Sequence, residues 1–201
     1  MPGVGGLIIS MFALHAGMSN DGPICDSLTF VSRSEWGARP PKDPPTHIGH
    51  PVNMSFIHHS LSPGACFDKE ACMKAVRGIQ NFHMDTRGWN DIGYSFLIGG
   101  DGRVYEGRGW DIVGAHTLGY NSVALGFCII GDYTASLPSD AAIQAAKNVI
   151  KCGVDKGYII ESYELFGHRD GGYTECPGDA LYHLIHSWPN FSRRKIPKHR
   201  A

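Results

Sequence analysis

Apolar runs in this chain predict several strands of different burial. Residues 52–57 form a strand that ends at His58. Residues 125–130 are an almost unbroken apolar run, which is typical of a central strand buried on both faces. A short strand at residues 164–166 leads into His168. We therefore expect two of the histidines to stand at strand ends.

A β-hairpin is predicted in the middle of the chain. Residues 94–98 and 103–106 are its two strands. The four residues between them are Gly-Gly-Asp-Gly, which tolerate the positive φ values of tight turns. The two strands should therefore pair antiparallel to each other.

Apolar residues at helical spacing predict three helices. The first has Asp68 as its N-cap and runs to about Arg87. The second follows Ser139 and stops at Gly157, and the third covers about residues 178–187. The buried stripes should be Cys72, Met73, Val76, Ile79 and Phe82 or His83 in the first helix, and Ile143, Ala146, Ile150 and Val154 in the second.

These elements follow one another as strand, helix, hairpin, strand, helix, strand and helix, which predicts a single α/β domain with a mixed sheet. The domain should occupy residues 25–191. Residues 39–51 hold five prolines and predict an extended surface strap. We expect residues 1–24 to be a signal peptide or a disordered N-terminal extension, and residues 192–201 to be a C-terminal tail.

Composition excludes several classes of protein. The chain has 201 residues, of which 42% are apolar and 18% charged, as in a globular domain. Its net charge of −1 argues against a nucleic-acid binder that relies on bulk electrostatics. The longest apolar segment, residues 4–14, is too short to insert across a membrane. It could belong to a signal peptide, although a basic start is missing and His15 interrupts it.

The chain has six cysteines, and their oxidation state would indicate whether the protein lies inside or outside the cytosol. Parity permits three disulfides, and the sequence alone does not assign their connectivity. We favour two, Cys66–Cys72 and Cys25–Cys152, with Cys128 a buried free thiol inside the apolar run. Disulfides would place the protein outside the cytosol, and a cytosolic protein would keep the same cysteines reduced.

The sixth cysteine completes a candidate metal site. His58, His168 and Cys176 offer two imidazoles and one thiolate, which are zinc ligands. Three protein ligands leave a fourth position for water, as a catalytic zinc requires and a structural zinc does not. The alternative for residues of these types is that they are surface or satisfied core groups, because the chain has 11 histidines.

Taken together, short motifs across most of the chain resemble the peptidoglycan recognition proteins, which are related to bacteriophage N-acetylmuramoyl-L-alanine amidases. In chain order the motifs are SEWGA at 34–38, FIHHS at 56–60, GWNDIGYSF at 88–96, GRVYEGRGW at 102–110, GAHT at 114–117, GHR at 167–169 and CPG at 176–178.

The resemblance implies a central mixed β-sheet flanked by three helices, with a groove that binds the muramyl peptide of peptidoglycan. In amidase-type members one zinc ion per chain serves cleavage of the bond between the lactyl group of N-acetylmuramic acid and L-alanine. The ligands carry over to His58, His168 and Cys176. Catalytic roles carry over to Tyr94 and Thr174. Non-catalytic members commonly have serine in place of the cysteine.

The resemblance also suggests a substrate preference. Gly88, Trp89 and Arg108 match positions associated with peptidoglycan that contains meso-diaminopimelic acid. This residue carries one more carboxylate than lysine, and a guanidinium can bind it bidentately. We expect His116 to contact the peptide, and His59 to face away from His58 as a structural residue.

The sequence therefore predicts a secreted zinc amidase acting in innate immunity. The alternatives are a receptor that binds peptidoglycan without cleaving it, and a bactericidal or agglutinating binding protein. The near-neutral charge disfavours membrane disruption by cationic attraction.

Overall fold

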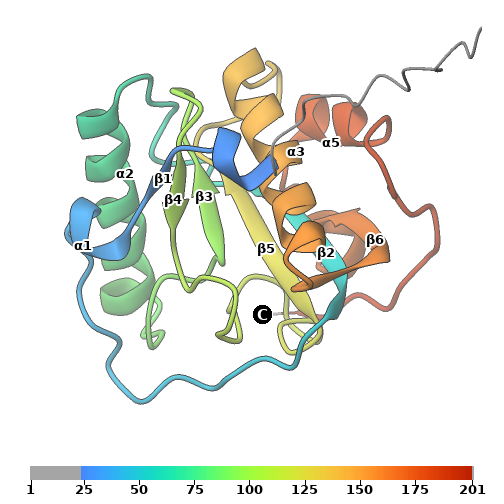
Figure 1. Cartoon of the computed structure of the whole chain (residues 1–201), viewed down its shortest axis with the longest axis horizontal. Helices are drawn as coiled ribbons and strands as arrows, with labels where there is room; N and C mark the ends of the chain where they lie inside the picture. Colours follow the sequence, from blue (N-terminus) through green and yellow to red (C-terminus); the bar gives the residue numbers. More distant parts are fainter. Residues whose placement is uncertain (1–23, 201) are drawn as a thin grey trace, which may run out of the picture.

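The computed structural model describes residues 24–200 and consists of one mixed β-sheet with helices on both faces (Figure 1). The sheet has six strands in the order β1-β4-β3-β5-β2-β6. The strands are β1 (Phe30–Val31), β2 (Val52–His59), β3 (Phe96–Ile98), β4 (Val104–Glu106), β5 (Ala124–Ile129) and β6 (Ile159–Gly167). The fold class predicted from the sequence is thus confirmed.

The helices follow the predicted order. They are α1 (Arg33–Trp36), α2 (Lys69–Asn81), α3 (Asp140–Asp155), α4 (His168–Gly171) and α5 (Asp179–Ile185), with a 3-10 turn η1 (Ile24–Ser27) and a π-helical turn η2 (Phe82–Thr86). Of these, α2, α3 and α5 are the three that were expected. None of the helices in the described part of the chain combines the length and apolar character needed to cross a bilayer.

The centre of the sheet is parallel. Strand β5 pairs in parallel with β3 on one side and with β2 on the other, and all six of its residues are buried, as predicted. Strand β2 also pairs in parallel with β6. Only β3 and β4, the predicted hairpin, run antiparallel.

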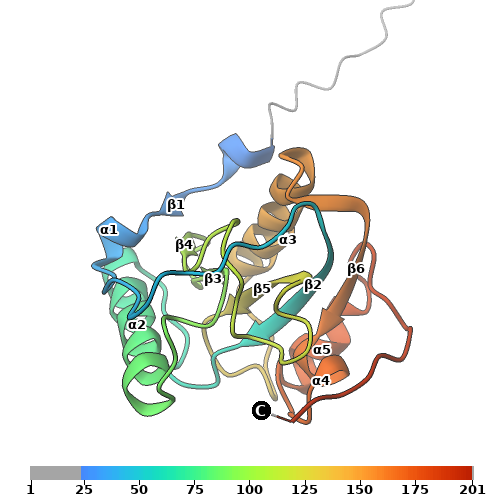
Figure 2. The same cartoon turned by 90° about the horizontal axis from the view of Figure 1, so that it is seen from below.

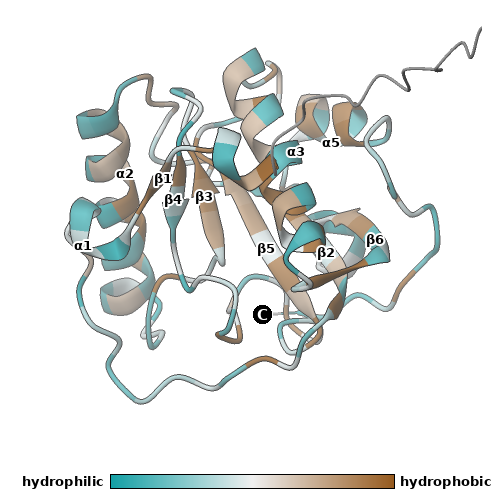
Figure 3. Cartoon of the chain, viewed as in Figure 1, coloured by the Kyte–Doolittle hydropathy of each residue, from teal (hydrophilic) through white to brown (hydrophobic). Residues whose placement is uncertain are grey.

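The two faces of the sheet are covered differently. Helix α2 lies against one face and α3 against the other (Figure 2), and each turns its apolar side toward the sheet (Figure 3). On β5, Phe127 packs in the same apolar cluster as Val149 of α3, whereas Cys128 packs in the cluster of Val76 of α2. This alternation is the two-residue period of a strand. Because His58 pairs with Cys128, it shares the face toward α2.

Helix α2 forms as predicted at its start and differs at its end. The Asp68 side chain caps it by accepting a hydrogen bond from the amide of Ala71. The α-helix stops at Asn81 and widens into the π-helical turn, which turns His83 inward (6% exposed) and leaves Phe82 outside (48% exposed). A π-turn shifts the helical phase by one residue, so hydrophobicity alone could not choose between the two.

The hydrophobic pattern did not predict two segments, helix α1 and the first half of strand β6. Helix α1 has a Ser32–Glu35 capping box, a short polar signal without an apolar stripe. Strand β6 is nine residues long, where residues 164–166 were expected. Its first half carries exposed polar residues such as Glu161, because β6 is the last strand of the sheet and one edge meets solvent.

Both ends of the described chain are held against the domain, the first by a disulfide and the last by packing and a backbone hydrogen bond. Two disulfides are present, Cys25–Cys152 and Cys66–Cys72, the pairing favoured from the sequence, and Cys128 is a buried free thiol. Residues 192–200, expected as a tail, pack back onto the domain, with Ile196 buried and the His199 amide donating to the carbonyl of Gly171. The expected signal peptide or N-terminal extension lies outside the described residues, apart from Ile24.

The two disulfides should contribute unequally to stability. Replacing Cys25 and Cys152 with alanine opens a cross-link between residues 127 apart, so the free energy of unfolding should fall by about 4–5 kcal/mol through the added entropy of the unfolded chain. The matched Cys66 and Cys72 double variant opens a cross-link between residues 6 apart and should cost roughly 2 kcal/mol. Urea unfolding measures both, and the reverse order would contradict this explanation.

Candidate metal centre

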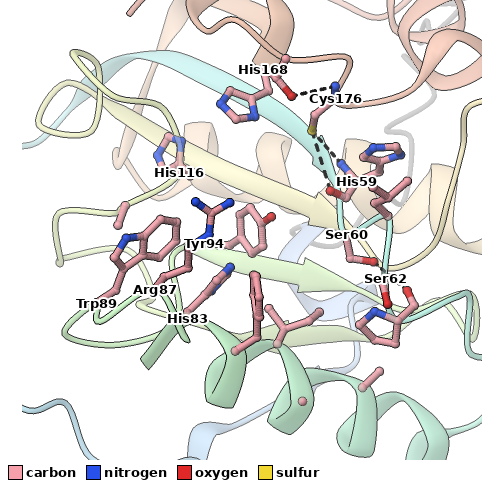
Figure 4. Close-up of a pocket in the computed structure, with 18 of the residues that line it drawn as sticks. His59, Ser60, Ser62, His83, Arg87, Trp89, Tyr94, His116, His168 and Cys176 are labelled. Atoms are coloured by element: carbon pink, nitrogen blue, oxygen red, sulfur yellow. Dashed lines mark hydrogen bonds between the residues drawn. The ribbon is translucent and has the colours of Figure 1, made fainter. Parts of the chain in front are cut away.

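Strand pairing brings the two candidate histidines together. Ile57 of β2 lies opposite Gly167 of β6, so His58 and His168 leave the same edge of two neighbouring parallel strands. Their rings are 4.5 Å apart between centroids. Cys176 reaches the same place from the loop between α4 and α5 (Figure 4).

The three side chains form a compact set of donors. One candidate ligand atom from each of His58, His168 and Cys176 lies within 4.8 Å of the others. The thiol Sγ of Cys176 is 3.8 Å from Nδ1 of His58. Zinc–nitrogen and zinc–sulfur bonds of about 2.0–2.3 Å set tetrahedral ligands roughly 3.3–3.8 Å apart. The donor types and spacing therefore fit a zinc ion.

The loop that carries Cys176 is held by its neighbours. The Arg169 amide donates to the carbonyl of Cys176 at 2.9 Å. The Arg169 guanidinium donates to the Asp179 carboxylate at 2.7 Å and to the carbonyl of Glu175. Thr174 Oγ1 accepts from the Cys176 amide at 3.2 Å. Arg169 thus ties the start of α4, where His168 stands, to the cysteine loop.

Burial keeps all three candidate ligands uncharged. It lowers the pKa of His58 well below its ordinary value, and the neighbouring histidines lower it further. Burial lowers the pKa of His168 to about 4. It also raises the pKa of Cys176 to about 12. Two smaller effects lower that pKa: the His59 amide donates to Sγ at 3.4 Å, and Arg169 carries a positive charge nearby. The imidazole lone pairs are therefore available at neutral pH, and a bound cation must displace the thiol proton.

Tyr94 stands beside the ligands. Its ring centroid is 5.2 Å from that of His58 and 5.5 Å from that of His83. Burial, followed by the neighbouring thiols of Cys128 and Cys176, raises the pKa of Tyr94 well above its ordinary value. The phenol therefore keeps its proton across the physiological range and can donate a hydrogen bond.

His116 packs against the site from the β5 side. Its ring is 5.2 Å from that of His58, and burial lowers its pKa to about 3. Gly126 makes the space for this ring, because a Cβ at that position would lie 2.4 Å from the imidazole. The glycine in the middle of a buried strand thus has a packing reason.

A cavity of about 990 Å³ runs over the site, between α2 and the loop that carries Cys176 (Figure 4). Its wall from α2 includes the apolar Ala75 and Ile79 together with Lys74, and its lining also includes Arg87 and Trp89. The cavity is open and elongated enough to hold a ligand of several residues.

Other predicted site residues have varied positions. Tyr94, Trp89, His116 and Thr174 line the cavity, whereas Gly88 and Arg108 are not among its lining residues. Gly88 has φ of +71°, which favours glycine at the turn before Trp89.

Arg108 uses much of its guanidinium inside the protein. Its Nε donates to the carbonyl of Ile92 and its Nη1 to that of Val113, both at 2.7 Å. The guanidinium that lines the cavity is that of Arg87, 5.9 Å from the Trp89 ring. We did not predict Arg87 as a site residue, and its only sequence signal is its position just before Gly88.

His59 is not part of the ligand set. Its Nδ1 accepts a hydrogen bond from the amide of Tyr133 at 3.2 Å, which ties β2 to the loop after β5. His59 also lines the cavity, and its structural role stays a prediction.

Comparison with known proteins places this site in a family. The family model described as N-acetylmuramoyl-L-alanine amidase matches residues 48–179. Peptidoglycan-recognition protein LB of Drosophila melanogaster is 45% identical over 194 residues, covering 96% of this chain and 83% of that protein. Human N-acetylmuramoyl-L-alanine amidase is 45% identical over 168 residues, covering 83% of this chain. The chain spans only 29% of the length of that human protein.

Solved structures agree with the sequence relatives. Wild-type Drosophila PGRP-LB has a TM-score of 0.81 and 48% identity, covering 86% of this chain and 99% of that one. A PGRP-LB mutant in complex with tracheal cytotoxin has a TM-score of 0.80 and 49% identity, covering 82% and 96%. The chain therefore belongs to the peptidoglycan recognition proteins and carries the N-acetylmuramoyl-L-alanine amidase domain of that family.

Proposed function

We propose that this protein is a zinc-dependent amidase of bacterial peptidoglycan. It cleaves the bond between the lactyl group of N-acetylmuramic acid and L-alanine, with wall of the diaminopimelic-acid type as its substrate. The observation that carries this proposal is the meeting of His58, His168 and Cys176 beside a cavity of about 990 Å³, which His168 and Cys176 line.

His58, His168 and Cys176 would hold the zinc ion. The fit rests on their chemistry, because two neutral imidazoles and one buried thiol are a ligand set that suits zinc and few other groups. When bound, zinc supplies a Lewis acid that polarises the scissile carbonyl and lowers the pKa of water.

The chain's own residues orient the substrate and supply a proton. The protonated phenol of Tyr94 lies next to His58, where it donates to the negative charge that develops on the carbonyl oxygen. Thr174 holds the amide of Cys176 and lines the cavity. The apolar wall of α2 excludes water from the alkyl parts of the peptide stem.

Arginine side chains would recognise the extra carboxylate of diaminopimelic acid. Arg108 keeps guanidinium hydrogens beyond those given to the carbonyls of Ile92, Val113 and, at 3.5 Å, Asp91. Arg87 lies in the cavity beside Trp89. Tracheal cytotoxin, bound in a solved PGRP-LE complex, is described there as a monomeric peptidoglycan of the diaminopimelic-acid type, and that protein is 41% identical to this chain.

We propose that the protein acts outside the cell, in defence against bacteria. Two disulfides within one domain are stable in an oxidising compartment and rare in the cytosol. The bacterial wall is encountered in the same extracellular space.

A receptor without enzymatic activity is the second candidate. The cavity and its polar end would serve binding equally well in a receptor. A complete set of three ligands next to a buried, protonated Tyr94 favours the enzyme, since binding alone requires neither.

Replacement of Cys176 separates these two functions. We expect Cys176→Ser to weaken zinc binding by more than about a hundredfold, because a hydroxyl is a poor zinc ligand beside a thiolate, and to abolish release of peptide from peptidoglycan. Binding of a soluble diaminopimelic-acid muropeptide should persist. Zinc content, peptide release and calorimetric binding measure the three properties.

The other free thiol provides the control. Cys128→Ala removes a buried cysteine outside the ligand set and should leave zinc binding in place. Cleavage by Cys176→Ser at the wild-type rate would sink the amidase proposal.

Tyr94 is expected to act in the chemical step. Tyr94→Phe removes only the hydroxyl, so kcat should fall by about 10²–10⁴-fold, while zinc affinity and KM stay within a few-fold of wild type. Steady-state kinetics with a soluble muropeptide separate kcat from KM. A variant with unchanged kcat would exclude the phenol from the reaction.

Specificity should depend on a guanidinium. We expect Arg108→Lys to reduce the preference for diaminopimelic-acid over lysine-type muropeptide by about tenfold or more, since an ammonium cannot bind a carboxylate bidentately. Arg87→Lys is the matched comparison, and calorimetric titration with both ligands measures the ratio. If only Arg87→Lys lowers it, the recognition role belongs to the arginine in the cavity.

A further inference from the structure

A line of buried hydrogen-bonding groups leads from β5 to His58. Nε2 of His116 is 3.4 Å from the carbonyl oxygen of Ala124. Nδ1 of His116 is 3.1 Å from Oγ1 of Thr117, and the same Oγ1 is 3.5 Å from Nε2 of His58. The three side chains are all buried, with exposed fractions of 5%, 0% and 1% for His116, Thr117 and His58.

The chemistry of these groups sets the direction of every hydrogen bond. A carbonyl oxygen can only accept, so His116 carries its proton on Nε2 and donates it to Ala124. In the neutral ring Nδ1 is then an acceptor, and the Thr117 hydroxyl donates to it. A hydroxyl has one hydrogen, which leaves the Thr117 oxygen as an acceptor toward His58.

The last member of the line must therefore donate. Nε2 of His58 holds a proton and points it at Thr117, which leaves Nδ1 of His58 unprotonated, with its lone pair toward the Cys176 thiol. That nitrogen is the one that lies 3.8 Å from the thiol of Cys176. The line thus presents the nitrogen that faces the other candidate ligands in the form that can bind a metal.

The surrounding backbone holds Thr117 and His116 in place. The side-chain oxygen of Asn121 accepts from the amides of both residues, at 2.8 and 2.9 Å. A Cβ at Gly114 or Gly126 would lie 2.4 Å from the His116 ring, so both glycines are needed for its position. The Thr117 methyl group faces Gly171, where a Cβ would lie 3.0 Å from it.

We propose that Thr117 is a positioning residue of the metal centre, which with His116 holds His58 in the tautomer protonated at Nε2. His116 thereby acts from behind the ligand, in addition to the peptide contact expected for it. This inference rests on the proposed zinc site. It goes beyond that proposal by assigning the ligating nitrogen of His58 and the side chains that select it.

Two substitutions of Thr117 separate its hydroxyl from its shape. Thr117→Val keeps the methyl contact with Gly171 and loses the hydroxyl, whereas Thr117→Ser keeps the hydroxyl and loses the methyl group. We expect Thr117→Val to weaken zinc binding by about 10–100-fold, as loss of a hydrogen-bond partner behind a metal-bound histidine does elsewhere. Thr117→Ser should stay within about threefold of wild type. Competition with a zinc chelator measures the affinities in the full-length protein.

A second measurement reads the tautomer without any metal. Long-range ¹H–¹⁵N NMR spectra of the metal-free protein report which ring nitrogen carries the proton. We expect wild type and Thr117→Ser to show His58 protonated at Nε2, and Thr117→Val to show a mixture of both tautomers. His50 lies outside the cavity lining, with its Nε2 3.1 Å from Oδ1 of Asp111, so its signals should be the same in all three proteins and serve as the internal control.

The outcomes distinguish this inference from the function on which it rests. Equal zinc affinity and an unchanged His58 tautomer in Thr117→Val would overturn the positioning role. Equal weakening by both variants would assign Thr117 to packing and likewise overturn it. A wild-type protein that binds no zinc would sink the proposed amidase, whereas the tautomer spectra of the metal-free proteins would still decide the role of Thr117.

Discussion

The parallel pairing of β2 with β6 is the constraint on which the candidate site depends. Its register sets Ile57 opposite Gly167. The residue that follows each of them in the chain is a histidine, so His58 and His168 lie at the same edge of the sheet. A slip of one residue would turn every side chain of a strand to the opposite face and separate the two imidazoles. The register is held because both strands bury apolar side chains, with Phe56 stacked on Phe166 at 5.5 Å between ring centroids.

The two faces of the sheet carry side chains of different size. Toward α3, β5 presents the large side chains of Leu125, Phe127 and Ile129, which fill the main apolar core. Toward the cavity it presents Ala124, Gly126 and Cys128, which are small. Large side chains on one face stabilise the fold through burial, and small ones on the other leave room for His116 and Tyr94. Stability and the space for a site are thus provided by alternate residues of one strand.

Desolvation governs the chemistry of this face. It holds the histidines neutral, keeps the thiol of Cys176 protonated and preserves the phenol of Tyr94. A cation that binds here displaces the thiol proton and pairs with the thiolate that forms. The attraction between these two charges is strong because the surroundings have a low dielectric constant. The same burial favours fixed hydrogen-bond directions, since no water competes for Thr117 or for the far side of His58.

The fold class, the central strand, the two main helices with the first cap at Asp68, and the three metal-ligand candidates could all be predicted from the sequence. Those features are written in local patterns and in motifs of distinctive residue types. The sequence did not distinguish His83 from Phe82 as the inward residue, reveal the full length of β6 or single out Arg87 and Thr117. These features became visible in the folded chain, because a helical phase shift, an exposed sheet edge and contacts between residues distant in sequence leave no periodic pattern in the sequence.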